Sequence, residues 1–170
     1  MTRSATGRIA SSPAGQSIVL ERTFNAPIGD VWKSVTEPER MNRWIGTWKG
    51  TAGTGKQVSF AMTAEGDVDY HPVDILLCDE PHQLIVDSII PGFGTWHLTL
   101  ELVENEGVTT LTFSHLLASE ENVGSFAAGW EYYIDRLVAT YTGEEFADFG
   151  EYYPDQSPYW EEAYAAAVQG

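Results

Sequence analysis

The longest helical pattern in this chain is an amphipathic stretch from residue 120 to residue 142. Its apolar residues recur at spacings of three and four, which places them on one face of a helix. The residues on that face are Val123, Phe126, Trp130, Tyr133, Ile134, Leu137 and Tyr141. Gly143 follows them, where a left-handed helix cap is expected, and Gly129 indicates a close approach to a sheet or space for a cavity. The pattern therefore predicts a long helix that buries one face.

Alternating apolar and polar residues predict strands over most of the chain before this helix. The first strand is expected at residues 17–24, and two short helices follow it, beginning at Pro27 and Pro38. The remaining strands are expected between residues 58 and 117. The prediction is an α+β fold, in which a curved antiparallel sheet of about six to seven strands wraps around the long carboxyl-terminal helix.

The alternation also predicts which strand residues face inward. Pro72 implies an edge or a bulge that shifts the alternation. The residues expected to face inward after it are Val73, Ile75 and Leu77. In the next hairpin, matching the apolar faces of the two strands turns His115 inward beside Trp96 and turns His97 outward, because neighbouring residues of a strand point to opposite faces.

Candidate catalytic and metal-binding motifs give little support for chemistry. His97 and His115 face opposite sides, so no metal site is predicted, and no organic cofactor and no catalytic residue are assigned. Residues 50–56 match the spacing of a phosphate-binding loop, but a glutamine and a strand-like segment follow them instead of a hydroxyl residue and a helix. Glu131 and Asp135 lie opposite the apolar stripe of the long helix and are expected to be solvated.

Composition indicates a single acidic domain. The chain has 170 residues, 43% of them hydrophobic, and a formal net charge of -16, with Arg136 as the one basic residue after Lys56. Such a surface repels phosphate backbones, so nucleic-acid binding is not expected. Cys78 is the single cysteine and is expected to be a buried, inert thiol. No apolar run is long enough for a membrane span or a signal peptide, and a cytoplasmic location is expected.

The two terminal segments differ from the rest of the chain. Residues 1–16 are rich in small and polar residues without periodicity, and are expected to form a disordered arm before a domain at 17–142. Residues 143–170 are acidic yet rich in aromatic residues, and a closing helix is expected from Ser157 to about Val168. This extension is expected to pack on its own domain or on a partner in a homodimer, because so many rings need burial.

Aromatic residues on the expected inner faces are the best lead to a site. They either form a packed core or leave an apolar cavity between the sheet and the long helix, which is the usual character of a small-ligand pocket. The candidate ligand-binding residues are Trp44, Trp96, Phe113, His115, Phe126, Trp130 and Tyr133. The expected ligand is a small apolar or aromatic molecule.

Three segments carry a resemblance to a known family. They read RTFNAPIGDVWKSVTEPERMNRW, CDEPHQL and LTFSHLLASEENVGSFAAGWEYYIDRL. Over residues 17–142 the chain resembles the START-like (SRPBCC) superfamily, in the branch of homologues of the activator of the heat-shock-protein-90 ATPase. The resemblance implies the helix-grip fold, and makes Trp44, Trp96, His115, Phe126 and Trp130 the best pocket candidates.

The resemblance leaves three hypotheses about function. Relatives in the wider superfamily bind lipids, hormones or polyketides, so the first hypothesis is non-enzymatic binding of a small hydrophobic or aromatic molecule. The branch is similar to a domain of eukaryotic co-chaperones, which suggests a chaperone-linked interaction module that uses the acidic surface or the tail. Some relatives are aromatases or cyclases without metal or organic cofactor, which suggests a cofactor-independent enzyme with His115 as acid or base.

Overall fold

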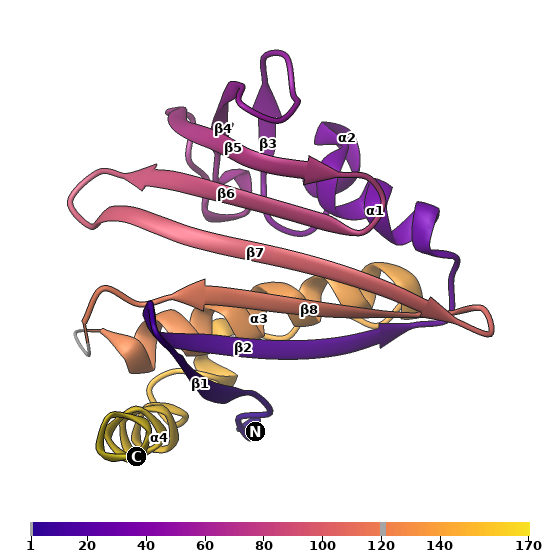
Figure 1. Cartoon of the computed structure of the whole chain (residues 1–170). Coiled ribbons are helices and arrows are strands. Elements are labelled where there is room, and N and C mark those ends of the chain that lie inside the picture. The colour runs from indigo at the N-terminus through magenta and orange to yellow at the C-terminus, as the bar shows by residue number, and fades with distance from the viewer. Residues whose placement is uncertain (1, 120–121) are drawn as a thin grey trace.

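The computed structural model describes residues 2–119 and 122–170. Eight antiparallel strands form one sheet in the order β1-β2-β8-β7-β6-β5-β4-β3, and a long helix, α3, packs against it (Figure 1). The strands are β1 Arg8–Ser12, β2 Gly15–Phe24, β3 Thr47–Lys49, β4 Gln57–Ala61, β5 His71–Asp79, β6 Gln83–Ile90, β7 Gly94–Asn105 and β8 Val108–Leu116. The helices are α1 Ile28–Thr36, α2 Pro38–Met41, α3 Val123–Thr142 and α4 Ser157–Gln169, with short 3-10 turns η1 Thr63–Glu65 and η2 Phe149–Glu151.

The predicted helix-grip fold is confirmed, with more strands than expected. One additional strand, β1, lies within the segment that the sequence pattern assigns to a disordered arm. It pairs with β2 through a tight hairpin, with Arg8 opposite Val19 and Ser12 opposite Gly15. The apolar pattern gave no strand signal here because Ile9 is the one large apolar residue of this five-residue edge strand. The strand is held by backbone hydrogen bonds to β2, which a side-chain pattern does not reveal.

Helix α3 buries the apolar face that the sequence predicts. Trp130, Ile134 and Leu137 are all buried in the main core, between the sheet and the helix. The helix begins at Val123, and the expected first residues, 120 and 121, lie outside the described part of the chain. Gly143 ends it in the left-handed conformation, with φ 77°, as predicted.

The β7–β8 hairpin has the predicted parity, whereas the shift in β5 occurs at a different residue. Leu98 lies opposite His115, and His115 is buried on the inner face. In β5 the pairing with β6 jumps between Ile75 and Leu77, so the extra residue is Leu76, which is exposed. The bulge turns Cys78 inward in place of the predicted Leu77, while Pro72 causes no shift.

The second face of α3 is covered by the two ends of the chain, so the expected solvation is wrong for Glu131, whereas Asp135 is half-buried. Glu131 is 1% exposed and accepts hydrogen bonds from the Thr6 backbone N–H, at 2.7 Å, and from the Thr6 hydroxyl. Asp135 accepts from Arg22 Nε at 3.0 Å and from the Tyr152 hydroxyl at 2.7 Å. The helix pattern could not reveal these contacts, because Thr6 and Arg22 are each more than 100 residues away in sequence from the acid that they contact.

Helix α4 packs on α3 and β1, close to the N-terminal segment (Figure 1). Trp160 of α4 is completely buried, the Tyr159 hydroxyl donates to the Gly7 carbonyl at 2.6 Å, and the Gln156 amide donates to the Arg3 carbonyl at 3.0 Å. Both terminal segments are thereby fastened to the domain and to each other. Within the described residues, no helix is both long enough and apolar enough to span a membrane.

Candidate functional site

Two adjoining cavities lie between the sheet and α3. The first, the apolar cavity, has a volume of about 180 Å³, and the second, the wide cavity, has a volume of about 700 Å³. Ser88, Leu98 and Trp130 line both, so these three side chains mark the junction between them. A cavity on the inner face of the sheet is the site that the sequence predicts.

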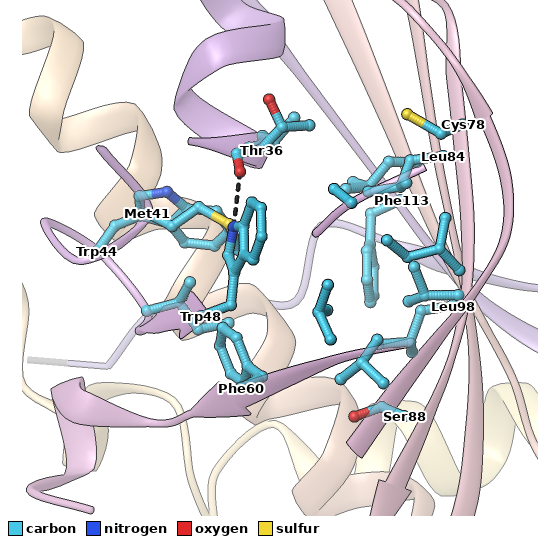
Figure 2. Close-up of a pocket in the computed structure, with 18 of the residues that line it drawn as sticks. Thr36, Met41, Trp44, Trp48, Phe60, Cys78, Leu84, Ser88, Leu98 and Phe113 are labelled. Carbon is cyan, nitrogen blue, oxygen red and sulfur yellow. Dashed lines mark hydrogen bonds between the residues drawn. The ribbon is translucent and has the colours of Figure 1, made fainter. Parts of the chain in front are cut away.

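The apolar cavity is enclosed by α1, α2, strands β3 to β8 and the middle of α3 (Figure 2). Almost all of its lining side chains are aliphatic or aromatic. The rings are Trp44, Trp48, Phe60, Phe113 and Trp130, and the aliphatic residues include Val58, Val73, Ile75, Leu84, Val86, Leu98, Leu100 and Ile134. Cys78 also lines it, and burial raises the pKa of its thiol, which keeps the thiol protonated and unreactive.

The polar atoms of the residues around the apolar cavity are already bonded within the protein. The Trp44 indole N–H donates to the Ser34 carbonyl at 2.9 Å. The Trp48 indole N–H donates to the Thr36 carbonyl at 2.7 Å, as the dashed line in Figure 2 shows. The Thr36 hydroxyl donates to the Trp32 carbonyl at 2.7 Å. A molecule in this cavity therefore meets mainly carbon.

The indole of Trp130 is held in place by His115. Trp130 Nε1–H donates to His115 Nδ1 at 3.0 Å, which requires the neutral ring to carry its proton on Nε2. His115 is 2% exposed and its ring packs on Trp96 and Phe126, with centroids 4.9 and 5.9 Å away. Burial, with a smaller contribution from His97, lowers the pKa of His115 to about 4. His115 is therefore a neutral acceptor that orients Trp130.

The wide cavity lies between the amino-terminal half of α3 and the segment around η1. Its lining combines aromatic rings with acidic and other polar groups. The Tyr133 hydroxyl donates to Glu65 Oε1 at 2.5 Å, which connects α3 to η1, and burial together with this bond raises the pKa of Tyr133. Asp67 and Asp69 line the same cavity. The wide cavity is thus polar and acidic on the η1 side and aromatic on the helix side.

A histidine and a serine meet at the junction of the cavities. His71 Nε2 lies 3.1 Å from Ser88 Oγ, and the two residues come from the neighbouring strands β5 and β6. Ser88 is 6% exposed, and burial lowers the pKa of His71, so its ring is neutral near pH 7. The His71 ring also packs edge-on against Phe60.

The structure places six of the seven sequence-predicted site residues in the cavity walls. Trp44 and Phe113 line the apolar cavity, while Trp96, Phe126 and Tyr133 line the wide one. Trp130 lines both. His115, by contrast, lines neither, because it lies behind the rings that it supports. That these residues bind a ligand remains a prediction.

Trp48, Ser88, His71 and Phe60 are among the lining residues that the sequence reasoning did not assign to the site. Trp48 lies in a three-residue strand too short to show alternation, and Ser88 is a polar residue at an inward position. His71 and Phe60 lie on inward positions of strands whose period was visible, so alternation could have found them. No group of three or more metal-ligating side chains occurs within residues 2–119 and 122–170.

The family is decided by a match over most of the chain. Residues 25–142 match the sequence model of the family described as Activator of Hsp90 ATPase homolog 1-like protein. The chain belongs to this family. The match confirms the resemblance seen in the three sequence segments, and the fold of this family is generally that of a small-ligand binding domain. A search of curated proteins gives no significant match.

Solved structures extend the similarity beyond the family match. The crystal structure of CalU16 from Micromonospora echinospora is 28% identical, with 97% of each chain covered and a TM-score of 0.71. DynU16, a protein of the dynemicin biosynthetic locus, is 23% identical over 78% of this chain and 50% of its own, with a TM-score of 0.67. A protein from Arthrobacter aurescens is 19% identical over 80% of this chain and 91% of its own, with a TM-score of 0.67. The latter two share the fold alone.

Proposed function

We propose that this protein binds a small apolar or aromatic molecule in the two cavities between the sheet and α3, as a binding protein rather than an enzyme. The observation that carries the proposal is the apolar cavity, whose lining tryptophans have their indole N–H groups bonded to protein acceptors. Binding of an apolar ligand against such a wall is favourable because apolar surface is removed from water, and the wall loses no hydrogen bond in the process.

The size of the site suits a molecule of one or two rings in the apolar cavity, with room for a further group in the wide cavity. A ligand that buries about 200 Å² of apolar surface gains about 5 kcal/mol before the cost of ordering it. DynU16, which shares the fold, belongs to a biosynthetic locus, which is consistent with a small organic molecule as ligand.

The two alternative hypotheses receive less support. A cyclase-like reaction with His115 as acid or base needs that ring to touch the substrate, but His115 is buried behind Trp96 and Trp130. A chaperone-linked role rests on the acidic surface and the tail, and much of the tail is occupied in fastening the N-terminal segment. The paired cavities favour ligand binding over both.

Isothermal titration with naphthalene-sized probes tests the proposal. Val86 lines the apolar cavity, so Val86→Phe should fill it and weaken binding about tenfold or more. Val103 is 65% exposed, and Val103→Phe is the matched control that should bind as the wild type does. Absence of binding to every probe, or unchanged binding in Val86→Phe, would overturn the proposal.

A further inference from the structure

A polar pair, Ser88 and His71, lies where the apolar lining of the first cavity meets the wide cavity. Ser88 from β6 lines both cavities, and His71 from β5 lines the wide one, with 3.1 Å between Ser88 Oγ and His71 Nε2. Figure 2 shows Ser88 at the edge of the apolar lining. A buried serine at an inward position of a strand forgoes apolar contacts there, so its presence needs a reason.

Ser88 differs from the other hydroxyl residue of the apolar cavity. The Thr36 hydroxyl donates to a carbonyl of its own helix, Trp32 O, and is thereby used within α1. Ser88 instead bonds to a side chain that lies in the wall of the wide cavity. A serine hydroxyl has one donor and two acceptor sites, so a single bond to His71 leaves Ser88 with further capacity toward the cavity.

The pair can present either a donor or an acceptor to a ligand. If His71 Nε2 accepts the Ser88 proton, the Ser88 oxygen can accept a hydrogen bond from a ligand hydroxyl. If Nε2 carries its own proton and donates it to Ser88, the Ser88 hydroxyl can donate to a ligand carbonyl. Both arrangements keep the imidazole neutral, and both suit a neutral polar group.

The charges of the lining point away from an anionic ligand. Neither cavity has a lysine or arginine among its described lining residues, whereas Glu65, Asp67 and Asp69 line the wide cavity. A carboxylate or phosphate would find no cation there and would be repelled by these acids. Fatty acids and phosphorylated ligands are therefore poor candidates.

From these observations we infer that the ligand carries a neutral hydroxyl or carbonyl group, which Ser88 and His71 bind at the cavity junction while the apolar part of the ligand fills the apolar cavity. This inference rests on the proposed function and makes it more specific. It assigns Ser88 and His71 as specificity-determining residues, and it predicts a phenol-like or ketone-like aromatic ligand.

Two matched probes test the inference by isothermal titration. 2-Naphthol and 2-methylnaphthalene have similar shapes, and they differ in that one carries a hydroxyl. The wild type should bind 2-naphthol about tenfold more tightly, which corresponds to one net hydrogen bond. In Ser88→Ala this preference should disappear, while the affinity for 2-methylnaphthalene stays unchanged. His71→Phe should reduce the same preference.

The controls separate recognition from structural damage. Ser114 lies between Phe113 and His115 on the other face of β8, and Ser114→Ala should keep the wild-type preference. The anionic probe 2-naphthoate should bind more weakly than 2-methylnaphthalene. The cationic probe 2-naphthylmethylammonium should bind no more tightly than 2-naphthol.

The possible failures are distinguishable. If both naphthalene probes bind equally to the wild type, or if Ser88→Ala weakens both equally, the inference is wrong while ligand binding stands. Tighter binding of either charged probe would also overturn it. If no probe binds at all, the proposed function itself fails, and the inference fails with it.

Discussion

Acidification is expected to destabilise this protein through His115. In the folded state His115 is 2% exposed and its Nδ1 accepts the Trp130 indole N–H, so the charged form would lose both its hydration and this bond. Its pKa is lowered from 6.5 to about 4, mainly by burial. Between these two values the unfolded chain binds a proton at this position and the folded chain does not. Stability is therefore greatest above the unfolded-state pKa and decreases as the pH falls toward about 4.

The size of the effect follows from the shift. Each pKa unit corresponds to about 1.4 kcal/mol, so lowering the pH from about 7 to about 5 should reduce the free energy of unfolding by about 2 kcal/mol through His115 alone. Other carboxyl and imidazole groups also titrate in this range, so the wild-type curve by itself does not isolate the effect. A variant without the imidazole at this position does.

His115→Asn is the comparison that isolates this residue. The asparagine carbonyl can accept the Trp130 N–H in place of Nδ1, and it does not titrate. Urea unfolding followed by circular dichroism at each pH should show the wild type losing about 2 kcal/mol more than the variant between about pH 7 and about pH 5. Parallel pH dependences for the two proteins would refute the buried, neutral state of His115.

Two further predictions concern the contacts around the cavities and the chain ends. Glu131→Ala should lower the free energy of unfolding by about 3 kcal/mol, because Glu131 is the buried acceptor of Thr6 and lies 3.8 Å from Arg22. Hydrogen exchange at the Thr6 amide should become faster in this variant. Glu162 is an exposed residue of α4, and Glu162→Ala should leave both the stability and the exchange rate unchanged. Tyr133→Phe removes the hydrogen bond to Glu65 across the wide cavity, so it should lower the free energy of unfolding by about 1 kcal/mol. It should also speed the release of a bound probe in stopped-flow experiments, and an unchanged release rate would contradict this role.

The sequence predicted the parts of the fold that depend on local period. The apolar stripe of α3 and the alternation of β7 and β8 were sufficient to place Trp130 and His115 on facing inner surfaces. Of the lining residues, the large rings on those surfaces could be predicted for the same reason. The distinction between a ring that lines a cavity and one that lies behind it, as for His115, depends on three-dimensional packing.

The remaining features depend on contacts between distant segments. Glu131 looked solvated because nothing near it in sequence reveals that Thr6 and Arg22 reach it from the N-terminal part of the chain. The bulge at Leu76 turned Cys78 inward without any glycine or proline at the bulge to mark it. Such features require knowledge of which strands and termini become neighbours.

The central claim is that the apolar cavity holds a ligand, and the indole N–H signals of the tryptophans test it most directly. Trp48 and Trp130 line that cavity, whereas Trp160, on the buried side of α4, lines neither cavity. In a ¹H–¹⁵N correlation spectrum, adding 2-naphthol should shift the indole signals of Trp48 and Trp130 with one common saturation curve and leave Trp160 in place. Unmoved Trp48 and Trp130 signals, at a probe concentration that shifts the Trp160 signal or the signals of exposed residues, would contradict the account.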